Sequence, residues 1–114
     1  MAPTPQLSAV DRTFRALADP TRRGVVAALG RGAASVTELA KPYDMALPSF
    51  MQHLRVLEDC GVVRSAKIGR VRTYELVPQA IQGAEGWLAE QRAVWEQRLN
   101  QLDDYLRRLK EQHT

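Results

Sequence analysis

Four side chains in one short stretch, residues 46–61, have the chemistry that is needed to recognise DNA bases. Ser49, Gln52, His53 and Arg55 carry a hydroxyl, an amide, an imidazole and a guanidinium. An ordinary solvated helix face would carry mostly Glu and Lys. The groups present here form hydrogen bonds with base edges in a major groove. The same stretch also fits an amphipathic helix with an ordinary polar outside, so the neighbouring elements decide between the two interpretations.

The pattern of the stretch predicts a helix. Pro48 falls in the first turn, where a missing N–H costs nothing, and Gly61 falls where a helix commonly ends in a left-handed residue. Phe50, Leu54 and Leu57 recur at steps of four and three, which places them on one apolar face. The four polar side chains then lie on the remaining surface.

Two helices are predicted at the start of the chain. Ser8 is a plausible N-cap for a helix over residues 8–18, whose apolar residues recur at helical spacing. Asp19 can cap a second helix over residues 20–29, with Pro20 in its first position. We expect Arg22 of this second helix to point outward.

A shorter helix should lie directly before residues 46–61. Residues 35–37 look extended, and Thr37 is the predicted cap of a helix over residues 38–43. Pro42 should shorten or distort the end of that helix. Residues 44–46 then form a tight turn. Two short helices joined by such a turn, the second with exposed polar residues, form a helix-turn-helix.

A basic β-hairpin follows, with strands predicted at residues 62–68 and 71–77 around a Gly69-Arg70 turn. From residue 62 to residue 74 the chain has four basic side chains and no acidic one. Beside a helix-turn-helix, such a hairpin is a wing that holds phosphates and reaches toward the minor groove. The alternative is a solvated hairpin whose cations only protect an edge strand. The residues expected to contact phosphate are Arg22, Lys67, Arg70 and Arg72.

A long helix is predicted over residues 83–111, with an apolar seam that repeats every seven residues. A helix of this length with two Trp and several Leu exposes too much apolar surface for one copy, so we expect it to pack on a second copy. The alternative is that it folds back on its own domain. The predicted dimer interface comprises Val10, Phe14, Leu17, Trp87, Leu88, Trp95, Leu99, Leu102 and Leu106.

The composition fits this organisation. The 114 residues carry a net charge of +3, one Cys and two His. The single Cys allows no intramolecular disulfide, and there is no apolar run long enough for a membrane and no secretory signal, so we expect a cytoplasmic protein without a membrane partner. The predicted organisation is a flexible terminus (1–7), a DNA-binding domain (8–78) and a dimerisation helix (79–114).

Five segments in this order and spacing resemble the ArsR-type winged helix-turn-helix repressors: FRALADPTRR (14–23), VTELA (36–40), LPSFMQHLRVLE (47–58), CGVVR (60–64) and GRVRTYEL (69–76). The tail resembles the subgroup with a long C-terminal helix. The resemblance implies a mainly α fold with a small β-hairpin: four helices, two strands and a fifth helix, assembled as a homodimer through the first and last helices. It also implies repression by occupation of a palindromic double-stranded DNA operator.

Some members of that family sense metals, and here the sequence departs from them. In the thiolate type the third helix carries a Cys-x-Cys pair, whereas the matching segment here, Glu38-Leu39-Ala40, has none. Another metal-sensing type uses His and carboxylate ligands of the C-terminal helix, and in the long helix here only Asp104 and His113 are a pair worth testing as metal ligands. Cys60 is alone, which excludes two-cysteine sensing within one chain, and is expected to act as a small packed residue. We therefore expect no cofactor and no metal, and the effector is not identified.

These features favour a DNA-binding transcriptional regulator, most simply a repressor. The alternative is a winged-helix module that recruits a partner protein through its heptad helix. An enzyme is disfavoured, because the sequence lacks a phosphate-binding Gly loop, a nucleophile with a supporting base, and paired carboxylates in an apolar setting.

Overall fold

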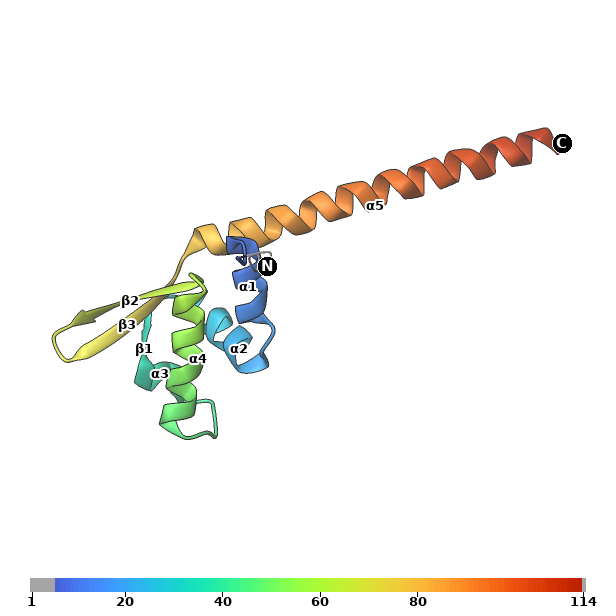
Figure 1. Cartoon of the computed structure of the whole chain (residues 1–114). Helices are drawn as coiled ribbons and strands as arrows, with labels where there is room; N and C mark the ends of the chain where they lie inside the picture. Colours follow the sequence, from blue (N-terminus) through green and yellow to red (C-terminus); the bar gives the residue numbers. More distant parts are fainter. Residues whose placement is uncertain (1–5, 114) are drawn as a thin grey trace, which may run out of the picture. The chain divides into compact units, whose positions relative to one another are not determined.

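The computed structural model describes residues 6–113, which form two units that meet between Ala84 and Glu85. The expected flexible terminus lies largely outside the described residues. None of the described helices is both long enough and apolar enough to cross a membrane. The elements are α1 (Ala9–Leu17), α2 (Pro20–Leu29), β1 (Ala34–Ser35), α3 (Val36–Ala40), α4 (Leu47–Asp59), β2 (Val63–Ile68), β3 (Val71–Leu76) and α5 (Pro78–Gln112) (Figure 1). The predicted fold class is confirmed.

The first two helices begin where their caps predict. The Ser8 hydroxyl accepts a hydrogen bond from the Asp11 amide, and the Asp11 carboxylate accepts one from the Ser8 amide, which completes a capping box. Asp19 caps α2 by accepting from the Arg22 amide at 3.1 Å. Pro20 occupies the first turn, as predicted.

The prediction for α3 was wrong at its start, whereas the end of the helix is shortened, as expected from Pro42. Its cap is Ser35 rather than Thr37, and the Ser35 hydroxyl accepts from the Glu38 amide at 3.3 Å. The Glu38 carboxylate accepts from the Ser35 amide at 3.3 Å. This reciprocal pair requires the carboxylate three residues after the cap, which only Ser35 satisfies. The helix ends at Ala40, two residues before Pro42, rather than at residue 43.

The sheet has a third strand that the sequence analysis did not predict. The strand order is β1-β3-β2, and all neighbours are antiparallel. β1 pairs Ala34 with Tyr74, and two residues are too few to show an alternating pattern. The hairpin pairs Ile68 with Val71 around Gly69, which adopts φ +65° in the tight turn. β1 thereby joins the start of α3 to the sheet.

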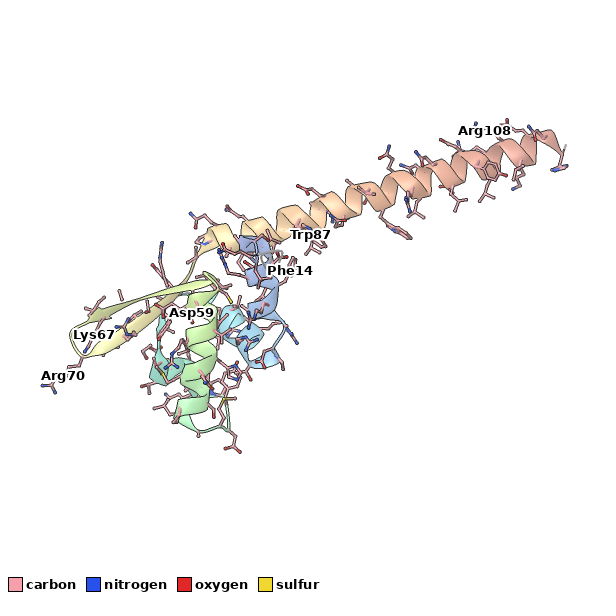
Figure 2. All side chains as sticks on the ribbon, viewed as in Figure 1. Phe14, Asp59, Lys67, Arg70, Trp87 and Arg108 are labelled. Carbon is pink, nitrogen blue, oxygen red and sulfur yellow. The ribbon has the colours of Figure 1, made fainter. Side chains whose placement is uncertain are left out.

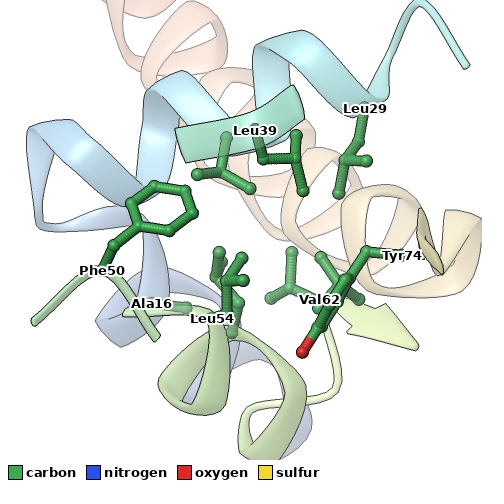
Figure 3. Packing of buried hydrophobic residues seen from close by; sticks show 10 residues of the cluster. Ala16, Leu29, Leu39, Phe50, Leu54, Val62 and Tyr74 are labelled. Carbon is green, nitrogen blue, oxygen red and sulfur yellow. The ribbon is translucent and has the colours of Figure 1, made fainter. Parts of the chain in front are cut away.

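The core of the first unit is built around α4. Phe50, Leu54 and Leu57 are each at most 1% exposed, which confirms the predicted apolar face. Figure 3 shows Phe50 and Leu54 among side chains from the other helices and the sheet. The helix ends at Asp59, and two residues later Gly61 adopts φ +78°, which lets the Val62 amide donate to the Leu57 carbonyl. The core comprises Ala16, Val25, Leu29, Leu39, Phe50, Leu54, Leu57, Val62, Val63 and Tyr74.

The last helix begins at Pro78, five residues earlier than the predicted start at residue 83. Pro78 occupies the first turn of this helix, where proline is well tolerated. The residues that follow belong to the first unit: Ala80 and Ile81 pack against the core, and Ala84 is buried. From Glu85 onward α5 forms the second unit.

Gly24 of α2 provides a test of this packing. A Cβ at this position would collide with the hydroxyl of Tyr43, whose ring packs against Phe50 at 5.5 Å between centroids. Gly24→Ala should therefore lower the free energy of unfolding by about 1–2 kcal/mol, because overpacking outweighs the roughly 1 kcal/mol by which alanine favours a helix. Urea unfolding measures the change as a shift of the midpoint.

The control is Gly86→Ala in α5, where an added Cβ meets no atom within 4 Å. This variant should be neutral or slightly more stable. Adding Tyr43→Phe to Gly24→Ala removes the colliding hydroxyl and should recover part of the lost stability. Equal stability of Gly24→Ala and Gly86→Ala would contradict the packing described here.

Candidate nucleic-acid interface

The outward face of α4 carries three of the four predicted base-reading side chains. Ser49, Gln52 and Arg55 are exposed and succeed one another at intervals of three residues. None of these three side chains forms a hydrogen bond or ion pair with another described residue. Their donors and acceptors are therefore available to a ligand. We call these three residues the α4 strip.

The first turn of α4 has no side-chain cap. Ala46 is the N-cap residue and its methyl group accepts no hydrogen bond. The first backbone bond of the helix runs from the Phe50 amide to the Ala46 carbonyl at 3.1 Å. The amides of Leu47 and Ser49 lie in the first turn and therefore have no acceptor inside the helix, and Pro48 between them has no N–H. These amides and the helix dipole can attract an anion.

His53, the fourth predicted base reader, lies beside the strip in a cluster with α2. Its Nδ1 is 3.3 Å from a terminal guanidinium nitrogen of Arg22 and 3.7 Å from a carboxylate oxygen of Asp19. The His53 side chain is only 24% exposed. Sequence reasoning identified Asp19 only as a helix cap, because no pattern in the chain connects it with a residue of α4.

Arg22 does not point outward as expected. Its Nε donates to the Ala16 carbonyl at 2.7 Å, and a terminal nitrogen donates to the Arg15 carbonyl at 3.2 Å. These are carbonyls near the end of α1, where helices lack internal donors. The guanidinium thus joins the end of α1 to α2 and α4. We call Asp19, Arg22 and His53 the α2–α4 cluster.

The charge of Asp19 is stabilised inside this cluster. Partial burial raises the pKa of its carboxyl group, but several effects together outweigh that. They are the hydrogen bond from the Arg22 amide, the charge that His53 carries in its protonated form, the charge of Arg22, and the hydrogen bond from the Thr21 amide, and the net pKa is lowered. Asp19 therefore remains an anion beside Arg22 and His53.

Two cations stand at the tip of the hairpin. Lys67 and Arg70 are exposed, and neither forms an ion pair within the part of the chain that the structure describes. Figure 2 shows both at the far end of β2 and β3, with Arg70 pointing away from the sheet. Arg64 differs, because its Nε lies 2.6 Å from a carboxylate oxygen of Glu75. The hairpin is therefore less positive near its base than the sequence analysis assumed.

Arg72 connects the hairpin to α4. It donates to the Ser65 hydroxyl at 2.9 Å, and that hydroxyl donates to the Glu58 carboxylate at 2.8 Å. Ser65 faces Tyr74 across the ladder, and burial followed by the negative charge of Glu58 raises the pKa of the Tyr74 phenol. Sequence reasoning missed Ser65 and Glu58, because their contact depends on how the hairpin folds against the helix. The bonds fix the hairpin relative to the α4 strip.

The predicted dimer residues fall into two groups, one in each unit. In α1 the side chains of Val10, Phe14 and Leu17 are half-buried. In the second unit the predicted residues are all exposed, by 44–62% of their surface. They are Trp87, Leu88, Trp95, Leu99, Leu102 and Leu106.

The candidate sensing residues form no recognisable centre in residues 6–113. No group of three or more His, Cys, Asp or Glu side chains in that range is arranged to hold a metal ion. Asp104 lies 3.9 Å from Arg107, an exposed pair that contributes little. Cys60 is half-buried and packs against the core, as its assignment as a small packed residue predicts.

Comparison with known proteins identifies relatives over this part of the chain. A family model described as a helix-turn-helix domain matches residues 17–66. The HTH-type transcriptional regulator Rv2034 of Mycobacterium tuberculosis (strain ATCC 25618 / H37Rv) is 39% identical over 71 residues, which cover 62% of this chain and 66% of that protein. The arsenical resistance operon repressor of Escherichia coli (strain K12) is 33% identical over 87 residues, covering 71% of this chain and 74% of that protein.

Solved structures agree. The crystal structure of an ArsR family transcriptional regulator superposes with a TM-score of 0.75 and 54% sequence identity, over 78% of this chain and 98% of that one. Another, an ArsR-like transcriptional regulator from Rhodococcus sp. RHA1, gives a TM-score of 0.70 at 30% identity, over 82% of this chain and 89% of that one. These relatives are regulators rather than enzymes, and the chain belongs to the ArsR family of winged helix-turn-helix transcriptional regulators.

Proposed function

We propose that this protein is a sequence-specific, DNA-binding transcriptional repressor that acts in the cytoplasm as a homodimer on a palindromic operator. The proposal depends most on two surfaces whose polar groups have no partner among the described residues. The α4 strip offers free hydrogen-bonding groups, and the hairpin tip offers free cations. The Glu58–Ser65–Arg72 hydrogen bonds hold the two surfaces in a fixed relation.

In the proposed complex α4 enters the major groove and the hairpin contacts the backbone. Gln52 is the best base reader, because an exposed amide can donate one hydrogen bond to an adenine and accept another from it. Ser49, His53 and Arg55 contact base edges or nearby phosphates, and the uncapped amides of α4 receive a phosphate. The cations assigned to phosphate and the minor groove are Lys67, Arg70, Arg72 and Arg22, the last acting through the α2–α4 cluster.

We further propose that a second copy covers the apolar stripe of α5. The stripe repeats every seven residues from Leu88 to Leu109, as helices that pair in coiled coils do. The half-buried residues of α1 would extend this interface. Two α4 helices related by a two-fold axis would then enter successive major grooves, about 34 Å apart. The repeat also suits a different partner protein, but the uncommitted cations of the hairpin favour DNA as the ligand.

The first prediction concerns the hairpin. Lys67→Gln with Arg70→Gln should weaken binding to every duplex, because cations that neutralise phosphates carry no sequence information. The slope of log K against log salt should fall by about 0.9 for each cation, or roughly 3.6 for the four cations that the dimer loses. Fluorescence anisotropy over a salt series measures it, with a duplex selected by the protein from a random pool.

Arg108→Gln is the matched control, because it removes a similar charge from α5 and should leave the slope unchanged. Arg72 is left intact in this experiment, since its bond to Ser65 also holds the hairpin in place. An unaltered slope in the double variant would remove the hairpin from the proposed interface.

The second prediction concerns base reading. Gln52→Ala should reduce discrimination between the selected duplex and random DNA by about 1–3 kcal/mol, the worth of one good bidentate pair. Affinity for random DNA should barely change, because an amide neutralises no phosphate. The measurement is the ratio of the two affinities at fixed salt, with Gln101→Ala on α5 as the control. Full discrimination by Gln52→Ala would exclude Gln52 as a reader.

The third prediction concerns the uncapped helix. In Ala46→Ser the new hydroxyl can accept a hydrogen bond from the Ser49 amide. This bond should stabilise the free protein by about 1 kcal/mol. The same bond competes with a phosphate for that amide, so affinity for the selected duplex should fall. Hydrogen exchange provides the link: in the unaltered protein the Ser49 amide should exchange faster when free than when bound to DNA. Equal exchange rates would contradict a phosphate at this position.

A further inference from the structure

The α2–α4 cluster contains a hydrogen bond whose direction is set by chemistry. The guanidinium of Arg22 has only N–H donors, so His53 Nδ1 must be the acceptor in their 3.3 Å contact. An accepting Nδ1 carries no proton, and a neutral imidazole then holds its proton on Nε2. The competing arrangement, Nδ1–H donating to Asp19, has the longer distance of 3.7 Å and would direct that N–H against Arg22.

The second ring nitrogen is accessible. No described residue forms a hydrogen bond with His53 Nε2. Among the described residues, every buried side-chain nitrogen or oxygen has a hydrogen-bond partner, so Nε2 is not a buried atom. Nε2 therefore reaches solvent although most of the ring is covered. Arg22 itself is held in place by the carbonyls of Ala16 and Arg15, so it cannot turn away from the ring.

The position of His53 on α4 indicates what this donor meets. His53 is one turn beyond Ser49 of the strip and three residues from buried Phe50, which places it at the flank of the strip beside α2. A helix in a major groove has base edges ahead of its centre and phosphates along its flanks. A donor on the flank therefore faces the backbone.

We propose that Arg22 acts as a positioning residue that fixes His53 in the Nε2–H form, and that this neutral imidazole donates a hydrogen bond to a DNA phosphate. The inference rests on the proposed function, since it names one contact in the proposed complex. It reassigns Arg22, which supports the contact from behind rather than binding phosphate itself. It also makes His53 an uncharged contact, unlike Lys67 and Arg70.

Two substitutions of His53 distinguish the roles of its two ring nitrogens. The amide of His53→Gln can take the place of Nε2–H, whereas the shorter His53→Asn can only take the place of Nδ1. The probe is the duplex selected by the unaltered protein. His53→Gln should keep affinity within about threefold, and His53→Asn should lose about tenfold. The salt slope should stay the same in both, because a neutral donor releases no counterion.

Arg22→Lys tests the positioning role. A lysine keeps the charge but loses the fork that bonds the ring and both carbonyls. It should cost about as much affinity as His53→Asn, and the variant with both changes should cost no more than either alone. Imidazole ¹⁵N chemical shifts above neutral pH should report Nε2–H in the unaltered protein and a mixture of tautomers in Arg22→Lys. Urea unfolding confirms that each variant is folded before it is compared.

Several outcomes would overturn the proposal. One is an Nδ1–H tautomer in the unaltered protein. Another is a slope that falls in His53→Asn by about 0.9 for each protomer, which is the mark of an imidazolium on a phosphate. Equal losses in His53→Gln and His53→Asn, or additive losses with Arg22→Lys, would also count against it. Failure of the unaltered protein to bind any duplex would instead refute the proposed function.

Discussion

The rest of the first unit depends on the burial of one face of α4. Phe50, Leu54 and Leu57 lie in the core, and such side chains each contribute about 1.5–3 kcal/mol when they are fully buried. Rotating α4 to change what it exposes would bring these side chains into water. The burial therefore fixes which residues face outward, and the α4 strip is the necessary complement of the core. In the proposed complex, α4 would therefore need no intrinsic rigidity to recognise DNA, because the surrounding helices and the sheet hold it in place.

Polar contacts then adjust what burial leaves undecided. An apolar face sets the rotation of α4 only approximately, since apolar contacts have no direction. Hydrogen bonds do have direction, and two sets of them hold α4 at its middle and at its C-terminal end. Arg22 and Asp19 contact His53 in the middle of the helix, and Ser65 contacts Glu58 near the C-terminal end. The second set also gives the Glu58 carboxylate a hydrogen-bond donor.

The sequence predicted those features that depend on local periodicity and caps. Helical spacing found α1, α2 and α4 within a residue or two, and a run of cations found the hairpin. It failed where long-range contacts decide. β1 exists only because Ala34 meets Tyr74, and the N-terminal part of α5 is set by packing of Ala80 and Ile81 on the core. The same limit explains the site: exposure of Gln52 follows from the helix pattern, but the environment of Arg22 depends on residues of three different helices.

The partition of the cations shows why charge counts alone describe such a surface poorly. Arg64, Arg72 and Arg22 look equivalent to Lys67 and Arg70 in the sequence, yet each donates at least one N–H to another part of the protein. A guanidinium has five N–H donors in a fixed plane, so it can hold two elements together where a lysine cannot. Lysine and arginine without partners remain at the hairpin tip, where the ladder ends and no neighbouring carboxylate is within reach. In the proposed complex, phosphate binding would therefore depend most on Lys67 and Arg70, and Arg64, Arg72 and Arg22 would help to maintain the geometry in which those two can act.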